Sequence, residues 1–185
     1  MKRFVFAAFA AILPISLYAQ GGCPADLKAI PLHRVNQHQM VVGVSINHSG
    51  PYDFLLDTGT QVTVVDLALA ADLHLKATGN ATVAGVSFQG QAVYAKLDRF
   101  EVGDHVTANQ GVLVYDMKTV QGAGFAVRGL LGEDFLSRFD VLIDAQHNLL
   151  CIDDTGAMLA SMKGGRVSPL PLAANGSGPH HFAGR

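Results

Sequence analysis

The stretch FLLDTGTQVTVVD, residues 54–66, places one acid at the end of a short apolar run. A carboxylate at the mouth of a buried strand costs free energy unless it is well paired or has a function. Gly59 allows backbone angles that are closed to other residues, so we expect a sharp turn after Asp57 and Thr58. A carboxylate held in this way can act as a general base on water, or it can cap a turn. Both readings of Asp57 remain open at this point.

A catalytic aspartate of this kind needs a second acid. A single carboxylate ionises near its model value of about 4 and is a poor general base. Two carboxylates held together cannot both ionise, so one keeps a proton while the other activates water. FLLD at residues 54–57 has a weak echo in VLID at residues 141–144, where Asp144 also ends an apolar run.

The segments around this stretch predict a mainly β domain. Apolar residues alternate over residues 42–46, which indicates a half-buried strand. From Asp66 the spacing becomes helical, with Asp66 as the N-cap. Glycines separate β-prone pieces over residues 79–114 and indicate hairpins. Residues 133–139 predict one or two helical turns, and residues 140–153 predict two strands joined by a turn.

Length and charge restrict the class of protein. A chain of 185 residues with 49% hydrophobic residues can bury the core of one domain. The formal net charge is -2, with no basic cluster. Nucleic-acid binders carry a basic patch, so nucleic acid is not an expected partner.

The N-terminus has the layout of a secretory signal peptide. Lys2 and Arg3 precede an apolar run, and Ala19 is the expected last residue before cleavage. A retained membrane anchor is the alternative, but Pro14 and Ser16 interrupt the run before it is long enough to span a bilayer comfortably. We therefore expect an exported protein, periplasmic or secreted, with no stable membrane insertion after cleavage.

The sequence contains two cysteines, Cys23 and Cys151. In an oxidising compartment they can form a disulfide that ties the N-terminal arm to the last strand. Two unpaired cysteines are the alternative, and the sequence does not decide between them.

A second motif makes the Asp-Thr-Gly motif more specific. GLLGEDFL follows at residues 129–136, and together the two motifs resemble the retropepsin-type aspartic peptidases, in particular their small bacterial members, from about Val41 to Ile152. The resemblance implies a retropepsin-like closed β-barrel, the acid protease fold, with two short helices. The chain then divides into a signal peptide at 1–19, an N-terminal arm at 20–40, the peptidase domain at 41–154 and a flexible tail at 155–185.

The resemblance also implies how the site is completed. In this family each chain contributes half of the site, and two chains dimerise so that two Asp-Thr-Gly loops meet. Asp140 and Asp144 are not followed by Thr-Gly, so the second acid is expected to be Asp57 of another subunit. No cofactor is implied. The implied roles are Asp57 as catalytic acid, Thr58 as a hydroxyl bonding across to the partner loop, Gly59 as the turn, and Leu130, Leu131 and Gly132 as the segment beneath the loop.

The implied substrate is an extended polypeptide in the cleft between the subunits. A mobile hairpin would cover it, for which Val83–Val93 is the candidate. Retroviral members usually pair an acid two residues after the motif glycine with an arginine after the apolar-apolar-Gly segment. This chain has Gln61 and Glu133 there, so that ion pair cannot form, and a hydrogen bond between Gln61 and Glu133 could replace it. The implied substrate-binding residues are Leu55, Val64, Gly85 and Leu130.

The implied reaction is amide hydrolysis by water. One Asp57 takes a proton from the water as it attacks, while the other, protonated, donates a hydrogen bond to the carbonyl oxygen. The alternative is a non-catalytic peptide- or protein-binding module on the same fold. The histidines lack convincing zinc spacing, and no serine or cysteine lies in a nucleophile motif, so neither a metal site nor a covalent mechanism is expected.

Overall fold

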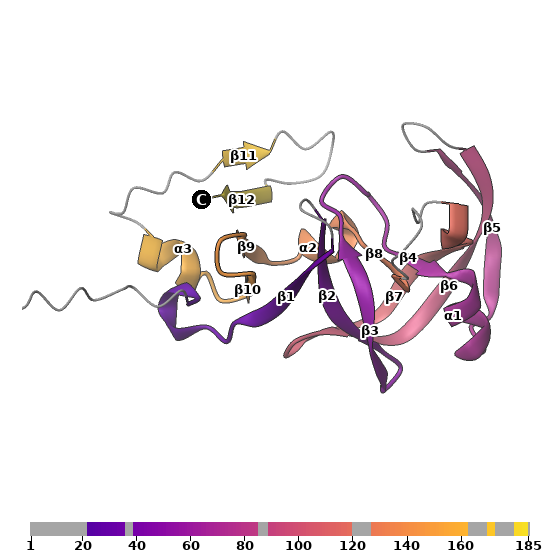
Figure 1. The fold of residues 1–185 in the computed structure, drawn as a ribbon, viewed down its shortest axis with the longest axis horizontal. Helices are drawn as coiled ribbons and strands as arrows, with labels where there is room; N and C mark the ends of the chain where they lie inside the picture. Colours follow the sequence, from indigo (N-terminus) through magenta and orange to yellow (C-terminus); the bar gives the residue numbers. More distant parts are fainter. Residues whose placement is uncertain are drawn as a thin grey trace, which may run out of the picture.

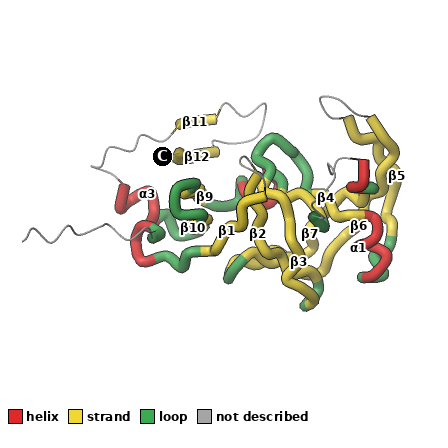
Figure 2. Tube along the Cα trace, in the orientation of Figure 1, coloured by secondary structure: helices red, strands yellow, loops and turns green. Residues whose placement is uncertain are grey.

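Most described residues lie in β-strands, as the computed structural model shows for residues 22–35, 39–84, 89–119, 127–162, 170–172 and 180–184 (Figure 2). A closed ring of strands forms because β2 pairs with β3, β3 with β8, β8 with β4, β4 with β7, β7 with β6, and β6 again with β2. The expected mainly β architecture is confirmed. The ring strands are β2 (Gln39–Ile46), β3 (Ser49–Leu56), β4 (Val64–Asp66), β6 (Gln89–Val102), β7 (His105–Tyr115) and β8 (Gly129–Leu131).

Two groups of strands extend the ring on opposite sides (Figure 1). On one side β5 (Ala77–Ala84) pairs with β6 as a hairpin. On the other, β1 (Ile30–Val35) pairs with both β2 and β10 and so connects the ring to a second group. That group consists of β9 (Asp140–Asp144), β10 (Leu149–Asp153), β11 (Leu170–Leu172) and β12 (His180–Gly184), in the order β11-β12-β9-β10.

The two helices expected from the sequence are present. α1 (Leu67–Asp72) begins directly after β4, and the Asp66 carboxylate accepts a hydrogen bond from the Ala68 N–H at 3.2 Å, which confirms the predicted N-cap. α2 (Glu133–Leu136) follows β8. The segment expected to be a flexible tail also carries a helix, α3 (Ala157–Met162), besides β11 and β12. Short 3-10 turns are η1 (Pro24–Asp26) and η2 (Met117–Thr119).

The main core fastens the strand that leads to Asp57. Phe54 on β3 is fully buried, and its ring meets Phe100 on β6 edge-to-face at 6.1 Å between centroids. Phe100 meets Phe135 on α2 in the same way at 5.4 Å. Such aromatic pairs add about 0.5–1.5 kcal/mol beyond their buried area. The core therefore fixes β3, β6 and α2 to one another close to the site.

A smaller core lies in the second group of strands. Cys23 and Cys151 form a disulfide, with 5.6 Å between their Cα atoms. Of the two alternatives left open by the sequence, the structure has the paired one. Leu142 and Met158 are buried beside the disulfide, so the N-terminal arm, β9, β10 and α3 pack together there.

Candidate active site

Asp57 begins the loop that connects β3 with β4, residues 57–63, which we call the Asp57 loop. The Asp57 N–H donates to the Leu131 carbonyl at 3.1 Å, which continues the parallel pairing of β3 with β8 by one residue. The side chain of Asp57 is half-buried, whereas Thr58 and Gly59 are exposed. The acid thus sits at the end of a fixed strand and at the edge of the solvent.

Two donors within the loop orient the Asp57 carboxylate. The Gly59 N–H donates to Oδ1 at 2.9 Å, and the Thr60 hydroxyl donates to Oδ2 at 2.8 Å. A carboxylate oxygen has two lone pairs, so each oxygen can accept a further hydrogen bond from a water or from a second acid. This arrangement gives a carboxylate of fixed direction that can still take part in chemistry.

Gly59 was expected to adopt backbone angles that are closed to other residues, and this expectation is wrong. Gly59 is not among the described residues with positive φ, so the turn does not need the freedom of glycine. A Cβ built on Gly59 would lie 3.4 Å from the Asp57 Oδ1 atom, an ordinary contact. The residue contributes its N–H to the carboxylate, and any residue has that group except proline.

The segment beneath the loop is where the sequence predicted it. A Cβ on Gly132 would lie 2.9 Å from the Thr60 carbonyl oxygen, the Thr63 nitrogen and the Val62 carbonyl carbon, so only glycine fits between the loop and α2. The Glu133 N–H donates to the Thr60 carbonyl at 2.8 Å. The loop is therefore wrapped around Gly132 and bonded to the start of α2.

The hydrogen bond considered between Gln61 and Glu133 is not formed between these two side chains. Asp134, the next residue of α2, holds the loop instead. Its Oδ1 accepts from the Thr63 N–H at 2.9 Å and from the Thr63 hydroxyl at 2.6 Å, and its Oδ2 accepts from Gln110 Nε2 at 2.7 Å. A backbone bond from the Asp134 N–H to the Gln61 carbonyl, at 3.2 Å, adds to this.

Residues 42–135, just over half of the chain, match a profile of the aspartyl protease family. The matched segment includes β3, the Asp57 loop, β8 and the start of α2. The chain belongs to the aspartyl protease family. A search of curated protein sequences finds no match.

One solved structure, a retropepsin-like protease, supports the fold, and two further solved structures show a weaker likeness. A retropepsin-like aspartic protease from Rickettsia conorii is 20% identical, with a TM-score of 0.50, over 69% of this chain and 91% of that chain. EIAV protease in complex with the inhibitor HBY-793 is 20% identical, with a TM-score of 0.44, over 56% and 91%. The retroviral protease-like domain of Ddi1 from Leishmania major is 19% identical, with a TM-score of 0.44, over 63% and 89%. The expected retropepsin-like fold is confirmed.

Three of the four predicted substrate-binding residues lie together in this aspartyl protease. Leu130 is the register partner of both Leu55 and Val64 on the neighbouring strands. The three share a cluster with the partly buried Leu113 and Tyr115, in which Val64 and Leu130 are buried and Leu55 is half-buried. The fourth, Gly85, lies outside the described residues, as does the tip of the candidate covering hairpin.

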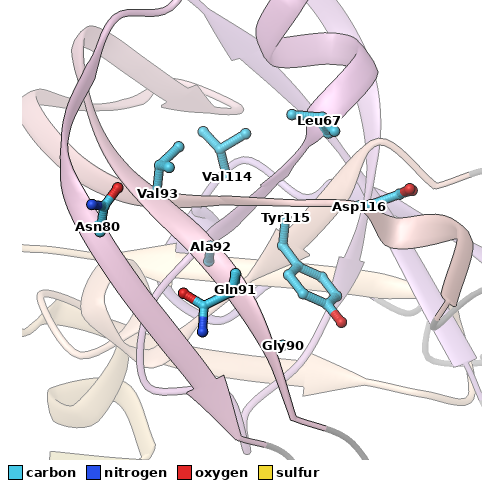
Figure 3. A pocket seen from close by; sticks show the side chains of 9 residues that line it. All are labelled: Leu67, Asn80, Gly90, Gln91, Ala92, Val93, Val114, Tyr115 and Asp116. Carbon is cyan, nitrogen blue, oxygen red and sulfur yellow. The ribbon is translucent and has the colours of Figure 1, made fainter.

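A hollow of about 370 Å³ lies between the β5–β6 hairpin, the end of β7 and the start of α1 (Figure 3). Leu67, Val93 and Val114 supply apolar side chains, and Asn80 and Gln91 present their amides. None of the described residues that line it belongs to the Asp57 loop. We therefore place the candidate site of the protease at Asp57, where the oriented carboxylate is, and treat the hollow as a separate feature.

Asp144, the aspartate that ends the second apolar run, is held by groups of its own turn. Asp144 is buried at the end of β9, where its carboxylate meets His147 Nδ1 at 2.7 Å and accepts from the Gln146 N–H at 3.0 Å. Burial alone raises the pKa of Asp144, but the hydrogen bonds from His147 and Gln146 outweigh it and hold the pKa below its ordinary value. The Asp144 carboxylate therefore stabilises the turn between β9 and β10.

No group of three or more metal-binding side chains occurs within the described ranges. Within the same ranges no helix has the length and apolarity that a membrane crossing requires.

The sequence did not reveal the three residues that anchor the Asp57 loop, which are Asp134, Thr63 and Gln110. The available signal was the pair of adjacent acids that opens a short helix directly after Gly132.

Proposed function

We propose that this aspartyl protease is an endopeptidase in which Asp57 activates the water that attacks a peptide bond. The observation that carries the proposal is the half-buried Asp57 carboxylate, fixed by the Gly59 N–H and the Thr60 hydroxyl at the open end of β3. Family membership supports the reaction class, and a carboxylate of defined direction can act as the general base on water that this reaction class uses.

We propose that a second Asp57, from another copy of the chain, completes the site. An acid pair must share one proton, and a single carboxylate cannot supply both the base and the acid. The exposure of Thr58 and Gly59 supports this part, because it leaves that side of the loop accessible to a second loop. In the paired site one Asp57 takes the proton of the attacking water, and the other donates to the oxygen of the scissile carbonyl.

We propose that the substrate is an extended polypeptide. The apolar cluster that contains Leu55, Val64 and Leu130 is formed by the strands next to Asp57, and its half-buried member Leu55 supports binding of apolar side chains there. The β5–β6 hairpin is the proposed cover of the bound chain.

The test is cleavage of fluorescein-labelled casein, an unfolded protein, by the purified chain at mildly acidic pH. Asp57→Asn removes the base and keeps the shape of the side chain, so we expect loss of cleavage with unchanged circular dichroism and unfolding midpoint. Asp144→Asn is the matched control, and we expect it to retain cleavage. A folded Asp57→Asn variant as active as the wild type contradicts the proposal, whereas bound but uncleaved casein with both proteins supports a binding module.

We also propose that the protein is exported and works in an oxidising compartment. The disulfide between Cys23 and Cys151 supports this location, because disulfides persist outside the reducing cytosol. Mass spectrometry of the mature protein checks it: the expected chain begins at Gln20, and an intact Met1 in the functional protein contradicts it.

A further inference from the structure

The carboxylate of Asp134, next to the Asp57 loop, accepts four hydrogen bonds. Its Oδ1 atom accepts from the Thr63 N–H, from the Thr63 hydroxyl and from the Phe135 N–H, at 2.9, 2.6 and 3.0 Å. Its Oδ2 atom accepts from Gln110 Nε2 at 2.7 Å. All four partners are donors, and an ionised carboxylate, which only accepts, satisfies all of them at once.

The partners of Asp134 are buried. Thr63 is fully inaccessible, Gln110 is 1% exposed, and Thr107, whose hydroxyl donates to Gln110 Oε1 at 3.3 Å, is 5% exposed. Buried polar groups destabilise a fold unless each finds a partner. Asp134 is the group that provides partners for both Thr63 and Gln110. It thereby ties the C-terminal end of the Asp57 loop to α2 and to β7 at once.

Backbone hydrogen bonds to β8 and to the start of α2 hold the loop at its first residue, Asp57, and at its middle, Thr60. The Asp57 N–H is bonded to the Leu131 carbonyl, and the Thr60 carbonyl to the Glu133 N–H, at 3.1 and 2.8 Å. Thr60 in turn donates its hydroxyl to the Asp57 carboxylate. Thr63 lies three residues along the loop from Thr60, the residue whose hydroxyl directs the carboxylate.

We propose that Asp134 is a positioning residue of the cleavage site, which acts through Thr63 and Thr60 on the direction of the Asp57 carboxylate. This inference rests on the proposed peptidase function. It adds a residue that does not contact the substrate, and it assigns to Gln110 the part of bracing Asp134 from β7. Thr63 donates to Asp134 through both its N–H and its hydroxyl, so it is the residue at which Asp134 holds the end of the loop.

The test compares Asp134→Ala with Asp153→Ala in the full chain. Asp153 is the control, because its carboxylate likewise accepts from a threonine hydroxyl, that of Thr155, and from backbone N–H groups, those of Thr155 and Met158; Asp153 is buried and Asp134 is half-buried. With fluorescein-labelled casein, we expect Asp134→Ala to lower kcat by about 100-fold with a smaller change in KM, the size expected for a catalytic group displaced by about 1 Å. We expect Asp153→Ala to lower the unfolding midpoint but to leave kcat of the folded protein unchanged.

Asp134→Asn is the conservative variant. Its Oδ1 still accepts from Thr63, and Gln110 needs only to turn its amide, so most of kcat is expected to return. Should Asp134→Ala fail to fold, Gln110→Leu removes the contact to the Asp134 Oδ2 atom, keeps the contacts to Oδ1, and is expected to lower kcat in the same direction. Equal loss of kcat in Asp134→Ala and Asp153→Ala, or no loss in the folded Asp134 and Gln110 variants, overturns the inference.

Amide hydrogen exchange separates this inference from the proposed function. We expect Asp134→Ala to speed exchange at the Asp57, Gly59 and Thr60 amides, and Asp153→Ala to leave these amides unchanged. Unchanged exchange in Asp134→Ala overturns the positioning role, whatever the activity. If the wild-type chain shows no cleavage that depends on Asp57, the proposed function fails, and exchange still decides whether Asp134 fixes the loop.

Discussion

Asp57 and Asp144 sit in two turns of nearly the same local geometry. Each follows an apolar strand, FLL in one case and VLI in the other. In both turns the N–H of the residue two positions on donates to Oδ1, at 2.9 Å from Gly59 and 3.0 Å from Gln146. In both turns the side chain three positions on meets Oδ2, at 2.8 Å for Thr60 and 2.7 Å for His147.

The difference lies in what surrounds each turn. Asp144 closes a tight hairpin between β9 and β10, accepts a further bond from the His147 N–H, and leaves only 12% of its side chain exposed. Asp57 opens a longer loop that is held from below by Gly132 and α2, and its side chain is half-buried. An aspartate at the end of an apolar strand therefore sets the turn, whereas the segment that supports the turn decides whether the acid remains available for chemistry.

The largest expected effect on stability comes from removing the acid that is fully engaged. Asp144→Ala removes a buried carboxylate that accepts hydrogen bonds from the Gln146 and His147 N–H groups, so we expect a loss of about 1–3 kcal/mol in the free energy of unfolding at neutral pH. Asp57→Ala, at the edge of the solvent, is expected to lose under about 1 kcal/mol by the same reasoning. Urea unfolding of both variants measures the difference. Equal losses would remove the distinction between the two turns.

This stability difference has a predictable pH dependence. The pKa of Asp144 is lower in the folded protein than in the unfolded chain, because hydrogen bonds from His147 and Gln146 outweigh the effect of burial. Its contribution is therefore complete above the unfolded pKa of about 4 and is lost as the pH falls through the lower folded value. We expect the gap between the wild type and Asp144→Ala to be largest near pH 7 and to narrow below about pH 4.

A smaller effect tests the residues that orient the two carboxylates. Thr60→Val removes the donor to the Asp57 Oδ2 atom with little change in shape, and we expect kcat to fall about tenfold, or about 1.4 kcal/mol. His147→Ala, at the corresponding position of the other turn, is expected to lower stability without lowering kcat. Steady-state cleavage of labelled casein by both variants measures this. A loss of kcat in His147→Ala would show that the second turn also serves the site.

Local patterns predicted much of the fold. The alternation over residues 42–46, the Asp66 N-cap and the two strands over residues 140–153 all follow from neighbours in the chain, and the structure confirms them. The closure of the ring depends on β2 pairing with β6, two strands far apart in sequence. Such a pairing is decided by packing of the whole domain, so only the resemblance to a known family supplied it.

The site was predicted in outline. Asp57 and the Leu130–Gly132 segment could be found because motif residues stand next to one another in the chain. Asp134 was missed, because its partners Thr63 in the Asp57 loop and Gln110 on β7 lie far from it in the sequence, and an acid in the first turn of a helix is common for reasons of helix capping. The role of Gly59 was misread because a glycine in a turn suggests positive φ, whereas here the N–H is what matters.

The most direct measurement is the activity of a dimer that carries one wild-type subunit and one Asp57→Asn subunit. The two forms are co-expressed with different affinity tags, and the mixed dimer is isolated by purification on both tags. Our account predicts no cleavage of casein by this dimer, since the site needs both carboxylates. Half of the wild-type activity in the mixed dimer, or full activity of a wild-type monomer, would contradict it.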